Sequence, residues 1–188
     1  ATGLPLILER IAENITVSFC PNSSSSPEST VFFPEYYEWL DEISPAHIFS
    51  RSIHGEGFRM RKSFENGILN YRKYDSCLEN ALTVESPESL CKIALNRLRW
   101  PSRLEDIFRE KYENVIKKYM GTAFTLAVKD QDFPMLQFIC EHFSPDASAL
   151  ASAIDQCIEK EWGEGNAFLI EAKHKSFSKK TFDFDLDF

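Results

Sequence analysis

The sequence has few of the patterns that assign a chain to a chemical class. It has no run of 18 apolar residues, so it predicts no membrane-spanning helix and no membrane partner. It has no HExxH pattern, and none of its four histidines stands four residues from another, which argues against a zinc site. Because no clear catalytic motif occurs either, the sequence predicts a protein that is not an enzyme, with no catalytic residues, no metal and no cofactor.

The five cysteines form no CxxC pair, are odd in number and are widely spaced. Cys91, Cys140 and Cys157 stand in apolar helical patterns, where a free cysteine acts as a small hydrophobic residue. Stable disulfides belong to oxidising compartments, and this pattern does not resemble a disulfide framework. We therefore predict reduced thiols and an intracellular location, in the cytoplasm or the nucleus.

Basic side chains are concentrated in the middle of a chain whose net charge is −8. Residues 51–103 carry ten basic and six acidic side chains, and the segments on either side are acidic. A predicted basic patch accompanies Tyr71 and Tyr74 and consists of Arg59, Arg61, Lys62, Arg72 and Lys73. Such a mixture suits phosphate contacts and base stacking, so a nucleic-acid-binding regulator is one alternative. RNP, KH and zinc-finger signatures are absent, which favours an acidic surface of this chain or of a protein partner as the contact.

The N-terminal region, residues 1–85, is predicted to be an irregular, mostly helical cap. Apolar residues at helical spacing predict a helix over residues 4–19, and a polar Ser-rich loop follows at 22–30. Pro34 at a first turn predicts a short helix over residues 34–43. A further helix is expected to start at 46–49. Asn66-Gly67 is a hairpin-type signal, but its flanks do not alternate cleanly and we expect a helix over 67–74.

The second half has stronger helical patterns. They predict helices over 86–99, 102–120, 122–129, 133–142, 147–161 and 167–174, with Gly121 as the C-terminal cap of the second. The tail, residues 177–188, is acidic and aromatic. From Thr181 onward, Phe182, Phe184, Leu186 and Phe188 alternate with three aspartates, and this period of two predicts an extended segment.

A faint internal repeat runs through this second half. The segment Ser89–Leu95 is echoed 33 positions later by Thr122–Val128. A fixed period of roughly 20–50 residues is typical of stacked-repeat proteins. The residues from Thr122 through Leu136 and Ile139 to Asp146 resemble an ankyrin repeat, although Ala123, Thr125 and Gln131 depart from its usual Pro, His and Gly. Weaker units start at Ser89 and Ser148.

The ankyrin resemblance implies an all-α fold of two to three stacked helical hairpins over residues 86–176. An unrelated all-α bundle is the alternative. Stacked repeats usually bind proteins, so we predict a non-catalytic interaction module or adaptor. The predicted partner-binding residues lie on the turns and inner helices and are Arg97, Arg99, Trp100, Lys129, Asp130, Gln131 and Asp132.

A second resemblance overlaps the first. Ser89-Leu90-xxx-Ala94-xxx-Leu98 is similar to the BC box that binds elongin C, and the segment from Trp100-Pro101 to Leu104 and Phe108 is similar to a cullin-contacting box. The implied alternative is a substrate receptor of an elongin–cullin ubiquitin ligase. Its site residues would be Leu90, Ala94, Leu98, Trp100, Pro101 and Leu104. This alternative requires an exposed Leu90/Leu98 stripe, because a stripe buried between repeats cannot also dock a partner.

Overall fold

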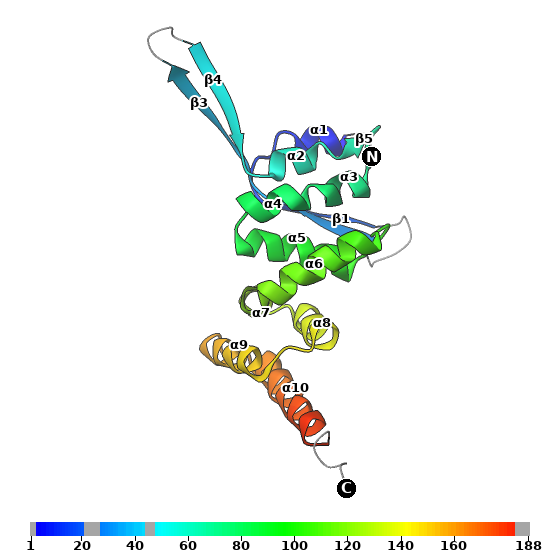
Figure 1. Cartoon of the computed structure of the whole chain (residues 1–188), viewed down its shortest axis with the longest axis vertical. Helices are drawn as coiled ribbons and strands as arrows, with labels where there is room; N and C mark the ends of the chain where they lie inside the picture. Colours follow the sequence, from blue (N-terminus) through cyan, green and yellow to red (C-terminus); the bar gives the residue numbers. More distant parts are fainter. Residues whose placement is uncertain (1–2, 21–26, 44–47, 183–188) are drawn as a thin grey trace. The chain divides into compact units, whose positions relative to one another are not determined.

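The computed structural model describes residues 3–20, 27–43 and 48–182 of the 188-residue chain. The chain forms two compact units, residues 1–112 and 113–188 (Figure 1). The division falls within helix α6 (Asp106–Lys118). No helix among the described residues combines the length and the apolar character that crossing a membrane requires.

Strands and short helices both build the first unit. Its strands form three two-stranded antiparallel sheets: β1 (Ile15–Phe19) with β2 (Ser29–Phe33), β3 (Tyr37–Ile43) with β4 (Ile48–His54), and β5 (Phe64–Glu65) with β6 (Ile68–Leu69). Its helices are α1 (Leu4–Leu8), α2 (Gly57–Arg61), α3 (Tyr71–Ser76), α4 (Leu78–Val84) and α5 (Pro87–Arg99). The prediction of an all-α fold with a mostly helical N-terminal cap is therefore wrong.

The predicted helix over residues 4–19 fails because two patterns overlap there. Only Leu4–Leu8 is helical. In β1, half-buried Ile15, Val17 and Phe19 alternate with exposed side chains, and this period of two matches a strand. β-branched residues fit a pleated surface better than a helix, so pairing with β2 decides the outcome.

Two further predicted helices are also strands. Residues 37–43 of the predicted helix 34–43 form β3, since Tyr37, Trp39 and Ile43 favour a strand. A helix start is predicted at residues 46–49. Residues 46 and 47 lie outside the described part, and residues 48 and 49 begin strand β4. The Asn66-Gly67 signal does mark a hairpin, because both residues have positive φ between β5 and β6. Asn70 then caps α3 through the backbone N–H of Lys73.

Strand β2 lies at the centre of the first unit, and all five of its residues are buried. The helix predicted at 86–99 is confirmed as α5, with Ser86 as its N-cap and Pro87 at its first position. Helix α5 packs against β2 rather than forming a helical hairpin of the kind the repeat pattern implied. The core of this unit is therefore a sheet–helix core.

The second unit consists of helices, and the helices predicted at 122–129 and 133–142 are confirmed. They are α7 (Met120–Lys129) and α8 (Phe133–Phe143), followed by α9 (Ala147–Glu159) and α10 (Gly163–Phe182). Gly121 is not a C-terminal cap, since it lies inside α7. The extended tail predicted over residues 177–188 is wrong up to residue 182, because α10 continues to Phe182; residues 183–188 lie outside the described part.

The helices of the second unit form two hairpins that stack on each other. Helix α7 contacts α8, α9 contacts α10, and the hairpins meet through α7 against α9 and α8 against α10. Both hairpin turns close alike: Gln131 and Glu161 have positive φ, and the N–H of the next residue donates to the carbonyl five residues back. These two hairpins are thus 30 residues apart, whereas the predicted unit starts, Thr122 and Ser148, are 26 residues apart.

Candidate functional site

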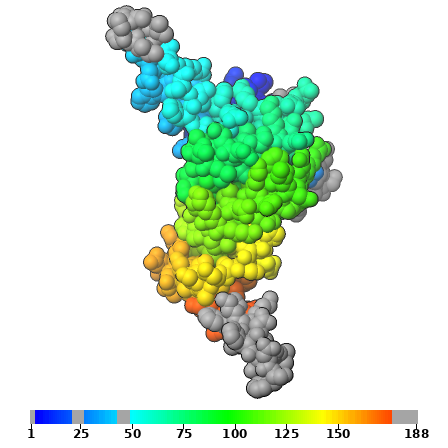
Figure 2. Space-filling model, in the orientation of Figure 1, coloured from blue at the N-terminus to red at the C-terminus, as the bar shows by residue number. Residues whose placement is uncertain are grey.

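Five large apolar side chains of the first unit are exposed on the β3–β4 hairpin, called here the arm. The strands are paired over seven residues each, from Tyr37 opposite His54 to Ile43 opposite Ile48. Apart from each other, they make no extensive contact with another described element. Figure 1 shows the two strands running away from the helices of this unit, and Figure 2 shows them as a projection. A two-stranded hairpin is only marginally stable alone, so this shape needs an explanation.

Large apolar residues occupy both faces of the arm. One face carries Tyr37 and Trp39, which are 59% and 55% exposed. The other carries Leu40, Phe49 and Ile53, of which Leu40 and Phe49 are 66% and 67% exposed. Contiguous exposed apolar residues of this size mark interaction sites in soluble proteins.

Side-chain contacts along the arm hold these residues in place. The Tyr37 ring stacks on the His54 ring, with centroids 5.0 Å apart. The indole Nε1–H of Trp39 donates to Asp41, and Arg51 pairs with Glu38 across the opposite face. Since the described arm carries Glu38, Asp41 and Glu42 against one arginine, its apolar residues are bordered by net negative charge.

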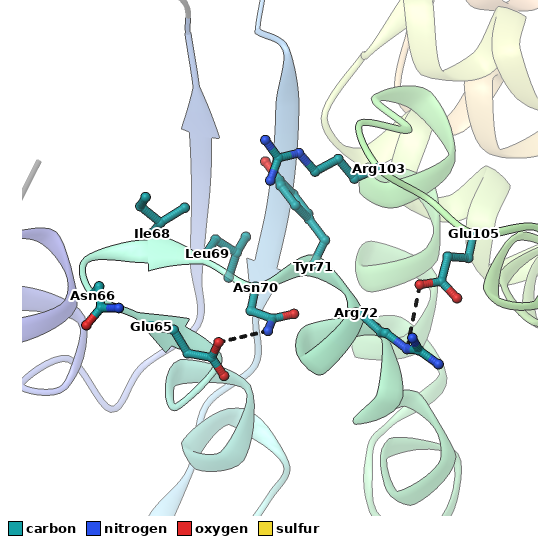
Figure 3. A pocket seen from close by; sticks show the side chains of 9 residues that line it. All are labelled: Glu65, Asn66, Ile68, Leu69, Asn70, Tyr71, Arg72, Arg103 and Glu105. Atoms are coloured by element: carbon teal, nitrogen blue, oxygen red, sulfur yellow. Dashed lines mark hydrogen bonds and ion pairs between the residues drawn. The ribbon is translucent and has the colours of Figure 1, made fainter.

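A second candidate is a pocket between the β5–β6 hairpin, the start of α3 and the segment before α6 (Figure 3). Its volume is about 480 Å³. Glu65 accepts a hydrogen bond from Asn70, and Arg72 lies 3.6 Å from Glu105. Ser29 and the Arg97 guanidinium hold the Tyr71 ring that forms one wall. Its lining carries two arginines and two glutamates, so the pocket has no clear preference for a charged ligand.

The structure divides the predicted basic patch. Arg61 is buried and donates to the carbonyl oxygens of Pro34, Gly57 and Glu13. Its guanidinium therefore links three backbone segments of the first unit and is not part of a basic surface. The other four cations are exposed, and each pairs with a glutamate of this chain. These pairs are Arg59–Glu56, Lys62–Glu9, Arg72–Glu105 and Lys73–Glu65.

The BC-box-like residues lie mainly inside the first unit. Leu90, Ala94 and Leu98 are buried, and so is Leu104. Trp100 is half-buried and Pro101 is exposed. The exposed stripe that an elongin-type partner requires is therefore absent from this conformation of α5.

The predicted partner-binding residues fall into three groups. Arg97 is fully buried and forms two hydrogen bonds to Asp75, of 2.8 and 2.9 Å. Arg99 and Trp100 are half-buried, with the guanidinium 4.5 Å from the centre of the indole. Lys129, Asp130 and Gln131 are exposed on the α7–α8 turn, whereas Asp132 caps α8 by accepting from the Met135 N–H.

The cysteines offer no reactive site in the interior. All five are free, and Cys77, Cys91 and Cys157 are buried. Burial, helped by the charge of Glu56, raises the pKa of Cys77 to about 11, and burial alone raises the pKa of Cys91 to about 12. Among the described residues, no three His, Cys, Asp or Glu side chains gather as metal ligands.

No protein-family model, no curated protein and no solved structure gives a significant match to this sequence. The sequence does not predict the arm because Pro34 at its start favours a helix N-terminus. Tyr37, Trp39 and Ile43 at odd positions, with Glu38 and Glu42 at even positions, are the strand signal that could have identified it.

Proposed function

We propose that this protein is a non-catalytic module that binds another protein, and that the arm is its main contact surface. The observation that carries the proposal is the exposure of five large apolar residues on a hairpin with no extensive support from the rest of its unit: Tyr37, Trp39, Leu40, Phe49 and Ile53. A partner that covered both faces would remove these residues from water and order the hairpin.

The chemistry of the arm specifies its partner. Tyr and Trp are enriched at the centres of interfaces, and Trp39 combines a large apolar ring with an indole already oriented by Asp41. The bordering charge is negative, so we expect an apolar partner surface flanked by Lys or Arg. The free state of all five cysteines supports an intracellular setting. The ankyrin resemblance remains a prediction.

The test is quantitative affinity capture from cell extract with three versions of the full chain. The versions are the unsubstituted chain, Trp39→Thr with Phe49→Thr, and the control Ile68→Thr. Threonine keeps strand propensity, and Ile68 is 67% exposed on the small β5–β6 hairpin. We expect one protein to be captured by the unsubstituted chain and by the Ile68→Thr control but not by the arm variant. After purification, this protein should bind the unsubstituted chain directly, and more weakly at high salt.

Equal capture by the arm variant and the unsubstituted chain would contradict the proposal. Circular dichroism and thermal unfolding of all three versions show whether the fold is intact, since substitutions at exposed positions usually change stability little.

A further inference from the structure

In the second unit, the α7–α8 hairpin is covered by the α9–α10 hairpin, whereas the corresponding face of the α9–α10 hairpin is exposed. Residues 30 positions apart are equivalent in the two hairpins, because the two turns have the same backbone hydrogen bonds. Ala123 and Ala153 are both buried, as are Ile139 and Leu169. This correspondence shows which side chains depend on a neighbouring hairpin for their burial.

Several residues of α9 and α10 are more exposed than their equivalents 30 positions earlier in α7 and α8. Val128 is 1% exposed, but its equivalent Ile158 is 58% exposed. If Ile158 faced back toward the first hairpin it would be covered; its exposure shows that it faces away, and that the second hairpin is what buries Val128. The same change, to a smaller degree, separates three further pairs, which are Phe124 and Ile154, Leu136 and Asn166, and Cys140 and Ile170.

These equivalents define an open face, made of Ile154 and Ile158 on α9 with Asn166 and Ile170 on α10. Each pair is four residues apart and so lies on one side of its helix. We infer that the open face binds a helical hairpin of another protein. The occupant follows from the existing interface between the two hairpins, in which the same positions are covered by a pair of helices.

Charge specifies the partner further. Asp155 and Glu159 lie within about one turn of Ile158, and neither has a hydrogen-bond or ion-pair partner among the described residues. On the α10 side, Lys173 and His174 follow Ile170 by three and four residues, so the acidic border is confined to the α9 side. A hairpin whose apolar face carries Lys or Arg opposite α9 fits this border. The inference is independent of the arm, which belongs to the first unit.

The test places the photo-cross-linking residue p-benzoylphenylalanine at position 158 of the full chain in cells. The expected adduct joins position 158 to a Lys- or Arg-bearing segment of a helical hairpin in a different protein. Ile170→Glu should reduce this adduct at least tenfold. The matched control is Ala167→Glu, which adds the same charge to the same helix at a position that is exposed in both hairpins.

Three results would overturn the inference: no adduct above background, an adduct to a second copy of this chain, or equal loss with Ile170→Glu and Ala167→Glu. Helical content of each variant, measured by circular dichroism, shows whether α10 remains folded. The arm variant, Trp39→Thr with Phe49→Thr, changes no residue of the second unit. The adduct at position 158 is therefore a separate readout, and it is expected whether or not the arm binds a partner.

Discussion

At the scale of single residues, one buried polar cluster determines how the first unit is held together. Asp75 on α3 accepts hydrogen bonds from Arg97 on α5 and from the Tyr112 hydroxyl on α6, all between 2.8 and 2.9 Å. Burial opposes the charge of Arg97, but the hydrogen bonds and charge of Asp75 outweigh it and raise the pKa of Arg97. Sequence patterns do not predict this pairing, because Asp75 and Arg97 lie on different helices, and Arg97 beside Trp100 has the composition of a surface binding site.

Replacing Asp75 with Asn tests this cluster. The substitution keeps the shape of the side chain but leaves the Arg97 charge buried without its counter-ion, so we expect a loss of about 3–5 kcal/mol in the free energy of unfolding. Urea unfolding followed by circular dichroism measures it. The control is Glu79→Gln, which removes an exposed pairing with Lys111 and should leave the midpoint nearly unchanged. Equal midpoints for Asp75→Asn and Glu79→Gln would contradict the assigned role.

The buried thiols predict a loss of stability at alkaline pH. Cys77 and Cys91 have pKa values of about 11 and 12 in the folded chain, against an ordinary value of 9.0. The unfolded chain therefore releases these protons first, so the contribution of the two thiols to stability is constant below about pH 8 and falls as the pH rises above 9. Each thiol contributes a slope of about 1.4 kcal/mol per pH unit between its two pKa values. Unfolding midpoints measured from pH 7 to 10.5 check this, and Cys91→Ala should reduce the slope.

At the scale of elements, local sequence signals succeed where neighbouring residues decide the structure and fail where pairing decides it. The N-cap Ser86 and Pro87 place the start of α5 correctly, because capping is local. Strand β1 is not predicted because the residues it pairs with in β2 lie 10 to 18 positions further along the chain, from Phe19 opposite Ser29 to Ile15 opposite Phe33. The arm is not predicted because Pro34 at its start favours a helix N-terminus. None of the apolar arm residues was among the site residues predicted from the sequence, because that prediction placed a helix over residues 34–43.

The two glycines in the first turn of α10 differ in the space around them. A Cβ on Gly165 would lie 2.4 Å from the Trp162 ring, whereas a Cβ on Gly163 would meet nothing within 4 Å. Gly165→Ala should therefore lower the stability of the second unit by about 1–3 kcal/mol through overpacking. Gly163→Ala, in the same helix, should leave it unchanged or slightly higher. Thermal unfolding compares the two, and a neutral Gly165→Ala would mean that Trp162 does not pack there.

At the scale of the whole molecule, the two units present different kinds of surface. The first unit offers strands with exposed aromatic residues, and the second offers stacked helices with an open face. The arm and the α9 side of the open face are bordered by negative charge, in keeping with the net charge of −8. If these surfaces bind basic partners as proposed, binding should weaken as salt screens the charges.

The most direct test of the central claim is hydrogen exchange of the arm, measured by mass spectrometry on the chain alone and on the chain purified with the protein that it captures. We expect fast exchange over residues 37–43 and 48–54 in the free chain, because few other parts of the first unit contact the hairpin. It predicts marked protection of these same amides in the complex. Protection confined to other segments, with the arm still exchanging fast in the complex, would contradict the claim that the arm binds the partner.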